Sequence, residues 1–215
     1  AAQTSPILPS AENDQIYLSW LWSYLRSQNQ RNKVNCIAFC QRENQMQSEK
    51  IARYFDLTDK VIVVTGGSRG LGLAMSRAFA EAGARVVISS RKADACARAA
   101  EMIERDTGRP CLPIACHVGD WNACDALVEA VYETYDRIDV LVNNAGMSPL
   151  YESPSRVSRE LFDKVIGVNL AGPYRLSALV GEQMARGDGG SIINVSSIAA
   201  VAPSAMELPY AAAKA

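Results

Sequence analysis

The sequence predicts an α/β fold in which a doubly wound parallel sheet carries helices on both faces. From Tyr54 onward, short β-branched runs alternate with helical patterns of about 10–15 residues, which is typical of a parallel sheet. Three separated glycines follow the first of these runs, and polar clusters follow the later ones. Because crossovers between parallel strands are right-handed, the natural strand order is 3-2-1-4-5.

The first strand and helix enclose the glycines. Four aliphatic β-branched residues, Val61–Val64, followed by Thr65, indicate a strand buried on both faces, and apolar spacing predicts a helix over Leu71–Ala82. Between them, Gly66, Gly70 and Gly72 give the spacing Gly-x-x-x-Gly-x-Gly. Residues without Cβ let backbone approach a pyrophosphate, which then sits on the helix N-terminus. The context therefore favours dinucleotide binding, and a plain tight turn is the alternative.

The remaining elements follow in chain order. Strands are expected over Arg85–Ser89, Cys111–Cys116, Ile138–Asn143 and Ser191–Val195, and helices over Asp94–Asp106, from Asp120 to about Tyr135, and over Ser158–Arg186. The last helix contains Pro173, so we expect a kink near Asn169–Gly172. Loops are expected over Met147–Val157 and Ser196–Pro209, and a final helix begins near Tyr210.

Two domains are expected, an N-terminal extension over residues 1–53 and a dinucleotide-binding domain over 54–215. The extension holds seven Gln, five Asn and no Gly. Within it, a helix over Ile16–Gln28 would be apolar around nearly its whole circumference and would need burial, an interface or a membrane surface. The alternative is a poorly ordered extension. Its apolar stretch is about half the ~20 residues that span a bilayer, so we expect no membrane segment.

Charge and cysteine usage exclude several classes of function. A net charge of −1 over 215 residues leaves no electrostatic footprint for nucleic acid or an anionic membrane. The chain has one histidine and no Cys-x-x-Cys spacing, so we expect no metal site. Reduced thiols in a cytoplasmic protein are the expected state of all six cysteines, Cys36, Cys40, Cys96, Cys111, Cys116 and Cys124.

A second motif lies at the end of the sequence. Tyr210-x-x-x-Lys214 places a phenol and an ammonium on one face of a helix. With Ser197 thirteen residues earlier, Asn169, the Asn143-Asn144-Ala145-Gly146 turn and the glycine loop, this pattern resembles the short-chain dehydrogenase/reductase family from about Tyr54 to the end of the sequence. The family's fold is Rossmann-type, and similar members include 3-oxoacyl-carrier-protein reductases and gluconate 5-dehydrogenase-like enzymes.

The resemblance implies four catalytic residues. Tyr210 would be the general acid in carbonyl reduction and the base in alcohol oxidation; because a phenol has an ordinary pKa of about 10, the Lys214 ammonium would be needed to favour the phenolate. Lys214 would also hold the nicotinamide ribose hydroxyls. Ser197, rather than the adjacent Ser196, would hydrogen-bond the substrate oxygen as charge develops there. Asn169 would hold a water in a proton relay.

The resemblance also implies a set of cofactor-binding residues along the ends of the strands. They are Gly66, Ser68, Arg69, Gly70, Leu71, Gly72, Ser90, Arg91, His117, Val118, Asn143, Ala145 and Gly146, together with Tyr210 and Lys214. His117-Val118 stands where the family usually has Asp-Val, and a neutral imidazole there would accept a hydrogen bond from the adenine amino group or stack beside the ring.

Cofactor choice is predicted from charge. The second strand ends in Ser90, Arg91 and Lys92, with no carboxylate to bind a ribose 2′-hydroxyl and repel a 2′-phosphate. Arg91 and Arg69 suit a 2′-phosphate, so NADP(H) is favoured over NAD(H). The alternative is that both arginines are solvated loop charges.

The resemblance predicts an oxidoreductase that interconverts a carbonyl and a secondary alcohol of a small molecule by hydride transfer. Family members continue beyond the Tyr-Lys helix with another strand, a lid segment and a final strand, so we expect the sequence to be a fragment that lacks the later strands. The alternative is a chain that binds a nucleotide without catalysis, or an interaction subunit. The full-length protein is expected to form a homodimer or homotetramer through the long helix after the fourth strand and the Tyr-Lys helix. A moderately apolar substrate is expected from its flanking residues, Met147, Leu150, Tyr151, Ala199, Val201, Met206 and Leu208.

Overall fold

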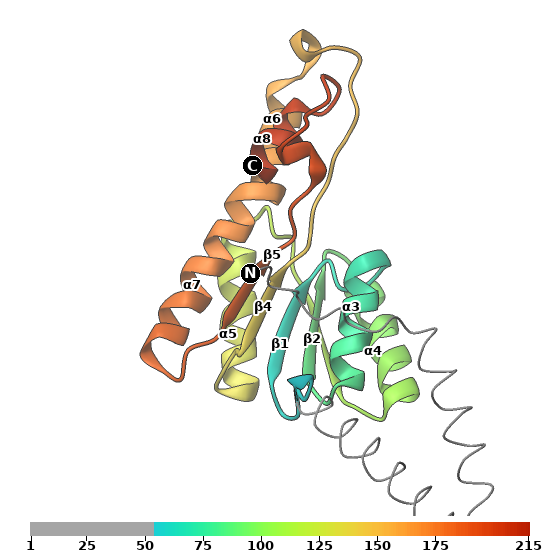
Figure 1. The fold of residues 1–215 in the computed structure, drawn as a ribbon, viewed down its shortest axis with the longest axis vertical. Helices are drawn as coiled ribbons and strands as arrows, with labels where there is room; N and C mark the ends of the chain where they lie inside the picture. The colour runs from blue at the N-terminus through green and yellow to red at the C-terminus, as the bar shows by residue number, and fades with distance from the viewer. Residues whose placement is uncertain (1–53) are drawn as a thin grey trace, which may run out of the picture. The chain divides into compact units, whose positions relative to one another are not determined.

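The computed structural model describes residues 54–215 (Figure 1). The chain divides into two units, Ala1–Phe55 and Asp56–Ala215, and the second unit contains the elements below. The predictions for residues 1–53, including those for Cys36 and Cys40, lie outside the described residues. Within residues 54–215, no helix is both long and apolar enough to cross a bilayer.

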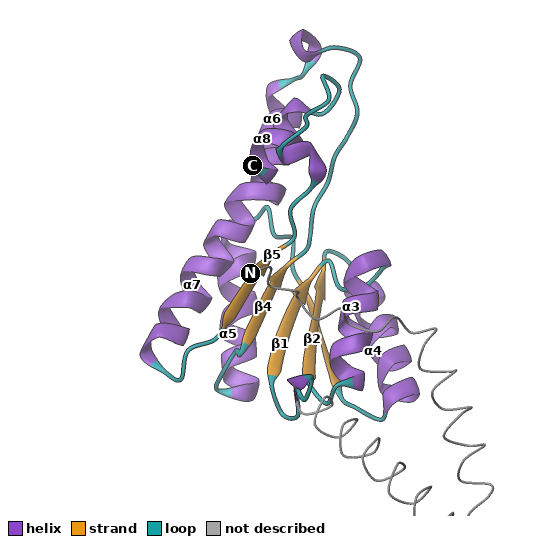
Figure 2. Cartoon of the chain, in the orientation of Figure 1, coloured by secondary structure: helices purple, strands orange, loops and turns teal. Residues whose placement is uncertain are grey.

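Five parallel strands form the sheet (Figure 2). In spatial order they are β3 (Cys111–Ala115), β2 (Arg85–Ser90), β1 (Val61–Thr65), β4 (Val140–Asn143) and β5 (Ser191–Asn194). This is the 3-2-1-4-5 order that the alternation of strands and helices predicts. In the centre, Val64 of β1 is paired with Ile88 of β2 and Val142 of β4, so the ends of the central strands align at one edge.

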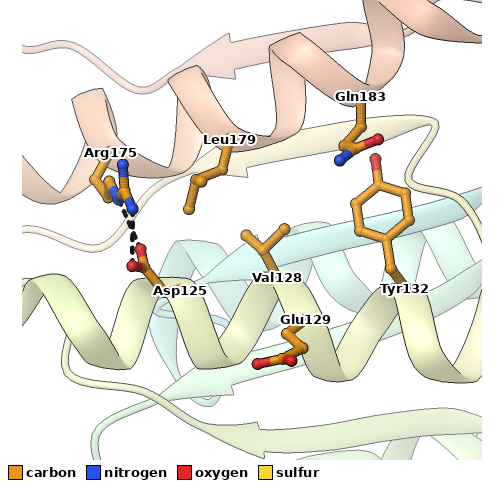
Figure 3. A pocket seen from close by; sticks show the side chains of 7 residues that line it. All are labelled: Asp125, Val128, Glu129, Tyr132, Arg175, Leu179 and Gln183. Atoms are coloured by element: carbon orange, nitrogen blue, oxygen red, sulfur yellow. Dashed lines mark hydrogen bonds and ion pairs between the residues drawn. The ribbon is translucent and has the colours of Figure 1, made fainter.

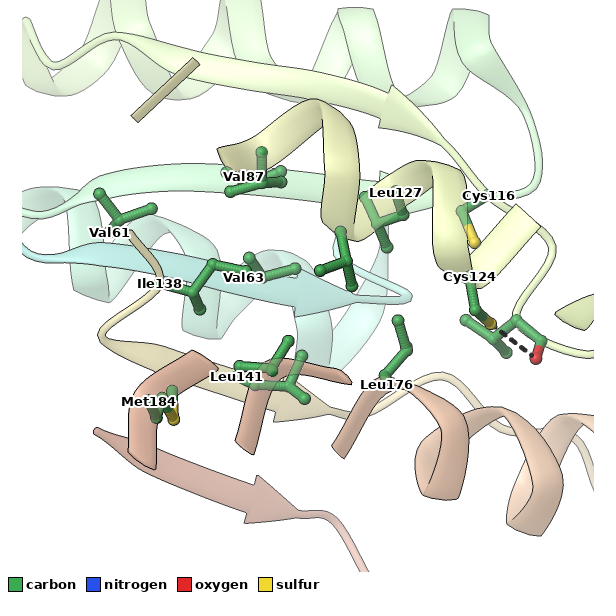
Figure 4. Packing of buried hydrophobic residues seen from close by; sticks show 14 of the residues in the cluster. Val61, Val63, Val87, Cys116, Cys124, Leu127, Ile138, Leu141, Leu176 and Met184 are labelled. Atoms are coloured by element: carbon green, nitrogen blue, oxygen red, sulfur yellow. Dashed lines mark hydrogen bonds between the residues drawn. The ribbon is translucent and has the colours of Figure 1, made fainter. Parts of the chain in front are cut away.

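Helices cover both faces of the sheet, with α3 and α4 on one face and α5 and α7 on the other (Figure 1). Their bounds are α3 (Gly70–Glu81), α4 (Ala93–Thr107), α5 (Trp121–Tyr135), α6 (Arg159–Ile166), α7 (Gly172–Arg186) and α8 (Leu208–Lys214). All five residues of β1 are buried, and they alternate between two cores: Val61 and Val63 face α5 and α7, whereas Ile62 and Val64 face α3 and α4. Figure 4 shows the first of these cores.

The long helical stretch after β4 is irregular at the place where the sequence predicts a kink. Between α6 and α7, the segment Gly167–Ala171 forms a π-helical turn. Pro173 has no N–H, so the carbonyl of Asn169 has no donor four residues ahead, and the wider turn accommodates that gap. The expected loops also contain short helical pieces, the 3₁₀ turns Pro154–Arg156 and Ile198–Ala200.

Helix α8 begins at Leu208, two residues before the predicted start, so the expected loop Ser196–Pro209 overlaps its first turn. Pro209 lies in this first turn, where proline is tolerated because the N–H it lacks has no helical partner. The prediction placed the helix start too late by treating this proline as part of the loop.

A buried carboxylate joins the amino ends of β1 and β4. Asp139 accepts hydrogen bonds from the backbone N–H of Val61 at 2.9 Å and from Lys60 Nζ at 3.2 Å, and it pairs with Arg137. Burial, the largest single effect, raises the pKa of Asp139, but together these hydrogen bonds and the guanidinium lower it below its ordinary value. Asp139 therefore fixes the edge of the sheet opposite the strand ends that carry the polar clusters.

Candidate functional site

The three glycines after β1 have three different reasons to lack a side chain. Gly66 has a φ of +67°, and a Cβ there would lie 2.9 Å from Asn144 Nδ2. A Cβ at Gly72 would overlap the carbonyl oxygen of Gly66, so the start of α3 packs directly on the turn. Gly70 has a φ of +54° and open space where its Cβ would be. The turn is therefore tight on its inner side and open on its outer side.

The N-terminus of α3 is free to receive an anion. Its N-cap residue, Arg69, makes no side-chain capping hydrogen bond, and the first turn contains no acidic residue. The first N–H groups of a helix carry partial positive charge and need acceptors. Together with the open space at Gly70, this arrangement fits the pyrophosphate of a dinucleotide.

The turn after β4 is fastened to the turn after β1. Thr65 Oγ1 accepts hydrogen bonds from the N–H groups of Asn144 and Ala145 at 3.0 and 3.1 Å and donates to the carbonyl of Val142. Asn144 Nδ2 donates to the carbonyl of Thr65 at 2.8 Å. Neither Thr65 nor Asn144 is among the predicted site residues, although both lie within the motifs that were recognised. Their role becomes visible only once β1 and β4 are known to be neighbours.

Asn143 is buried, and its side chain is bonded to the neighbouring strand and to a helix. Its Nδ2 donates to Asn194 Oδ1 at 2.9 Å and to Ser177 Oγ at 3.0 Å, which joins β4 to β5 and α7. Ala145 and Gly146 continue the chain along the ends of the strands. A Cβ at Gly146 would lie 3.0 Å from Asn169 Oδ1 and 3.7 Å from Lys214 Nζ, so Gly146 lies between two predicted catalytic residues.

The end of β2 carries no carboxylate within its last residues or the bend that follows. Ser90 Oγ lies 3.1 Å from Cys96 Sγ, and Arg91 is exposed just beyond it. Arg69, in the glycine turn, is exposed as well. Gly67 N–H donates to the carbonyl of Ser89 at 3.0 Å, so the backbone of the glycine turn is held directly against the end of β2.

His117 is partly buried at the end of β3, and Val118 beside it is buried. The Nδ1 atom of His117 accepts a hydrogen bond from the N–H of Gly119 at 3.1 Å. An imidazole nitrogen that accepts carries no proton, so Nε2 of the neutral ring carries it. Because Nδ1 is engaged within the chain, it is not available as the acceptor for an adenine amino group, one of the two roles that the sequence suggested; the other, stacking, stays a prediction.

Asn169 lies in the π turn and is 4% exposed. Its Oδ1 accepts from the N–H of Met147 at 3.1 Å, and its Nδ2 donates to the carbonyls of Met147 and Val165 at 2.8 and 2.9 Å. One amide proton therefore holds the chain where it leaves β4, and the other is used within the helical stretch, on α6. Its side chain acts on the backbone of the loop, and its own main-chain carbonyl lacks a donor four residues ahead because residue 173 is proline.

Lys214 reaches from α8 to the end of β5. Its Nζ donates to the carbonyl of Val195 at 2.7 Å, and burial lowers its pKa below the ordinary lysine value. Ser196 Oγ donates to the carbonyl of Lys214 at 2.8 Å, which ties the same two segments together in the opposite direction. The ammonium is thus fixed at the strand ends, within the edge that Gly146 also lines.

The hydroxyls of the two adjacent serines after β5 have different hydrogen-bond partners. Ser196 Oγ donates to the carbonyl of Lys214. Ser197 Oγ accepts from the N–H of Ala199 at 3.2 Å, so its own hydroxyl proton remains available to a further acceptor. Tyr210, on α8, lines a small void and has no hydrogen-bond partner for its hydroxyl among residues 54–215. The void is enclosed by Pro149, Tyr151, Leu161, Val165, Glu207, Pro209 and Tyr210.

The residues expected to make an apolar substrate wall are mostly turned outward. Tyr151 alone among them lines the void beside Tyr210, whereas Leu150 and Val201 are 74% and 80% exposed. Two polar residues that were not predicted, Ser148 and Glu207, form a hydrogen bond of 3.2 Å at this place. Glu207 lies three residues before Tyr210, and that spacing is the signal that could have drawn attention to it.

A second hollow, of about 410 Å³, lies between α5 and α7 (Figure 3). It is lined by Asp125, Val128, Glu129, Tyr132, Arg175, Leu179 and Gln183. At one end, Arg175 forms a two-point ion pair with Asp125 at 2.6 and 2.7 Å and lies over the ring of Trp121. None of the predicted catalytic or cofactor-binding residues lines this hollow.

Comparisons with known proteins find a family model and curated relatives that match most of this chain. The family model described as short chain dehydrogenase matches residues 60–215. The chain is 33% identical over 186 residues to human Dehydrogenase/reductase SDR family member 4, which covers 85% of this chain and 66% of that protein. The curated relatives that it matches are therefore longer: it spans about two thirds of their length or less.

Solved structures give the same result. A metagenomic short-chain oxidoreductase in complex with NADP is similar with a TM-score of 0.71 and 34% identity, over 74% of this chain and 72% of that one. L-sorbose reductase from Gluconobacter frateurii, complexed with NADPH and L-sorbose, is similar with a TM-score of 0.69 and 34% identity, over 73% of this chain and 59% of that one.

Proposed function

The chain belongs to the short-chain dehydrogenase family, and from that premise we propose that the protein interconverts a carbonyl and a secondary alcohol with NADP(H). The observation that supports the proposal most directly is the position of Lys214, whose ammonium is held on the carbonyl of Val195 and lies 3.7 Å from where a Cβ of Gly146 would be, one helical turn after Tyr210. Bound nicotinamide supplies the hydride in reduction and accepts it in oxidation. The steps below concern the residues of this chain.

Ser197 and Tyr210 act on the substrate oxygen. Ser197 keeps its hydroxyl proton because its oxygen accepts from Ala199, so it donates a hydrogen bond to the oxygen on which negative charge develops. Tyr210 delivers the proton to that oxygen in reduction and removes it in oxidation. Its hydroxyl is not engaged with the described residues and is free to do so.

Lys214 and Asn169 support Tyr210. The Lys214 ammonium, held on the carbonyl of Val195, favours the phenolate form of Tyr210 and offers donors to the ribose hydroxyls. Asn169 places a relay water through its main-chain carbonyl, because its side-chain amide is used on Met147 and Val165. In this assignment Asn169 is a positioning residue for the loop and for the proton path.

The cofactor assignment rests on the charge at the end of β2. Arg91 and Arg69 are exposed beside a strand end without a carboxylate, which suits a 2′-phosphate. Two structurally similar proteins are complexed with NADP or NADPH. We expect Arg91→Ala to weaken NADPH binding by about tenfold to a hundredfold and to change NADH binding little. Equal affinity of the wild-type protein for both cofactors would contradict the assignment.

Tyr210→Phe tests the catalytic assignment in the full-length protein. We expect turnover to fall by at least about a thousandfold, because the proton donor is lost, while the dissociation constant of NADPH stays within about twofold. Retained turnover would overturn the role of Tyr210. NADPH binding by the wild-type protein without turnover on any ketone or 3-oxoacyl thioester would favour the alternative, a nucleotide-binding protein without catalysis.

We also propose that the full-length protein forms a homodimer or homotetramer through the long helix after β4 and helix α8. Phe162, Leu170 and Tyr174 support this assignment, because all three are exposed large side chains on that helical stretch. Light scattering on the wild-type protein and on a triple serine variant would test it, with a monomeric wild type as the contradicting result. A cytoplasmic location, in keeping with the free thiols of Cys96, Cys111, Cys116 and Cys124, is testable by fractionation.

A further inference from the structure

The hydroxyl at the end of β2 has a thiol as its side-chain partner. Ser90 is the last residue of β2, and its Oγ lies 3.1 Å from Sγ of Cys96, near the start of α4. Ser90 is partly exposed, whereas Cys96 is fully buried. The thiol therefore supports the hydroxyl from the interior of the protein, at the strand end where the proposed function places the adenosine ribose.

The main chain around Ser90 is fixed on both sides. On one side, the carbonyl of Ser89 accepts from the N–H of Gly67 at 3.0 Å, which holds β2 against the glycine turn. On the other side, the carbonyl of Ser90 accepts from the N–H of Cys116 at 2.9 Å, just after β3. With its backbone held in this way, Ser90 can adjust only through rotation of its side chain and hydroxyl. The contact with Cys96 is therefore what sets the direction of the Ser90 hydroxyl.

The hydrogen bond between Ser90 and Cys96 can run in either direction. Sγ of Cys96 also lies 3.6 Å from the carbonyl oxygen of Ser90 and 3.7 Å from that of Ile114, so the thiol proton has alternative acceptors. When the thiol donates to a carbonyl, the Ser90 hydroxyl can donate to sulfur and turn its lone pairs outward. When the thiol donates to Ser90 Oγ instead, the hydroxyl proton is released for an acceptor outside.

The two directions suit different ligands. An ionised 2′-phosphate offers acceptor oxygens, so it needs the hydroxyl of Ser90 as a donor. A ribose 2′-hydroxyl both donates and accepts, so it is served by either direction. Only the phosphate therefore depends on a thiol proton at Cys96, and the state of this one hydrogen bond bears on the choice between NADP(H) and NAD(H).

We propose that Cys96 is a positioning residue for cofactor choice, whose thiol donates to Ser90 Oγ and thereby frees the Ser90 proton for the 2′-phosphate of NADP(H). The inference rests on the proposed function, since it takes NADP(H) as the cofactor and Ser90 as one of its binding residues. Arg91, exposed beside Ser90, supplies charge, whereas the hydroxyl supplies a directed hydrogen bond. Cys96 is buried and acts only through Ser90.

The test measures dissociation constants of NADPH and NADH by fluorescence titration of the full-length protein, and the readout is the NADH to NADPH ratio. Ser90→Ala is expected to lower this ratio by about fivefold to tenfold, because the phosphate loses a donor. Cys96→Ala is expected to lower it by about threefold to fivefold. Cys96→Ser, which keeps a donor at this place, should stay within about twofold of wild type.

A double-mutant cycle shows whether Cys96 acts through Ser90. In a Ser90→Ala background, adding Cys96→Ala should change the ratio by less than about 1.5-fold, because the hydroxyl that the thiol directs is already absent. Cys96→Val, which fills the space of the thiol without a donor, should give the same ratio as Cys96→Ala and keeps the test valid if the smaller side chain impairs folding.

Cys124→Ala is the matched control, because Cys124 is as fully buried as Cys96 but lies on α5, on the other face of the sheet. It should leave the ratio unchanged. A merely structural role of Cys96 would lower the free energy of unfolding and weaken both cofactors by the same factor, which leaves the ratio at its wild-type value.

The outcomes distinguish this inference from the proposed function. If the wild-type protein does not bind NADPH more tightly than NADH, the proposed cofactor fails and the inference with it. If the wild type prefers NADPH and both apolar Cys96 variants keep the wild-type ratio, the inference alone is wrong. An equal loss from Cys96→Ala in the wild-type and Ser90→Ala backgrounds would show that Cys96 does not act through Ser90 and would also overturn it.

Discussion

The glycine-turn region, β1 to α4, and the Tyr210 region, the segments after β4 and β5 with α6 and α8, are built differently. In the first, every residue of β1 is buried, and the site is made of backbone groups from one contiguous stretch. In the second, β5 is largely exposed, and the site is made of side chains from four separate segments. One site can thus combine two halves of different construction. The self-supporting half, the glycine-turn region, is built from one contiguous stretch, and the assembled half, the Tyr210 region, is built from separate segments.

The assembled half depends on hydrogen bonds between distant residues. Asn169 reaches Met147 across 22 residues, Lys214 reaches Val195 across 19, and Leu208 reaches Tyr151 across 57. Each of these bonds fixes a loop on which a predicted site residue lies. Changes in the glycine-turn region should therefore affect both folding and cofactor binding, whereas changes in the Tyr210 region should affect catalysis first.

The largest effect is expected for Gly72→Ala. The added Cβ would overlap the carbonyl oxygen of Gly66, so α3 and the turn must separate. We expect the free energy of unfolding to fall by about 3 kcal/mol or more and NADPH binding to weaken by at least about a hundredfold. Urea unfolding and NADPH fluorescence titration measure the two changes.

Gly181→Ala is the matched control, because its Cβ would meet only Ile192 at an ordinary distance of 3.6 Å. In helix α7 this change should leave stability unchanged or raise it by up to about 1 kcal/mol. Equal effects of the two substitutions would mean that the close approach at Gly72 does not matter.

Thr65→Val removes one hydroxyl that joins the two halves. It leaves the N–H of Ala145 without its partner, whereas the N–H of Asn144 keeps its hydrogen bond to the carbonyl of Val142 at 3.1 Å. We expect the free energy of unfolding to fall by about 1–3 kcal/mol, as measured by urea unfolding. Thr134→Val, which removes an exposed hydroxyl on α5, should cost less than about 0.5 kcal/mol. A loss below 1 kcal/mol for Thr65→Val would contradict the joining role.

Asp139→Asn removes the buried charge that holds the amino ends of β1 and β4 together, so it should lower the stability of the fold and leave the turnover rate unchanged. Because the pKa of Asp139 is lowered in the folded protein, its carboxylate stabilises the fold above the ordinary value of 3.8, and this contribution is lost as pH falls through the lowered pKa. We expect the variant to be about 2 kcal/mol less stable than wild type at pH 7.

The difference between the two proteins should shrink on going from pH 5 to pH 3, because protonation removes the same charge from the wild type. Urea unfolding at pH 7, 5 and 3 measures this convergence. A constant difference across the three pH values would show that the charge of Asp139 does not carry the effect.

The smallest effect on stability and on NADPH affinity is expected for Tyr151→Phe, in the Tyr210 region. It leaves the Leu208 N–H without its acceptor, at a partly exposed helix start. Stability should fall by about 1 kcal/mol or less, with NADPH affinity within about twofold of wild type. Tyr54→Phe, at a position that is 79% exposed, is the control. If Tyr151→Phe lowers NADPH affinity as much as Gly72→Ala does, then the Tyr210 region contributes to cofactor binding as strongly as the glycine-turn region, which would contradict the division between them.

The sequence predicts the glycine-turn region better than the Tyr210 region, for a physical reason. Strand, turn and helix in the first are specified by neighbouring residues, so the β-branched run at Val61 and the three glycines suffice to locate them. The bonds between Ser148 and Glu207 and between Asn144 and Thr65 join residues that are far apart, and no local pattern reports them. His117 shows the same limit, since its acceptor nitrogen is taken by Gly119, a neighbour in the chain whose orientation only the fold defines.

The π turn at Gly167–Ala171 has a consequence for how this helix can change over evolution. Substitution there alters a side chain, but deletion of one residue would rotate everything that follows by about 100°. Leu176 and Val180, which face the sheet, would then turn aside, although α6 and its contacts before the turn stayed in place. The π turn thus determines how α7, which packs on the core, is rotated about the helix axis relative to α6, which lies beside the site. Insertions and deletions should be far rarer across it than amino-acid exchanges.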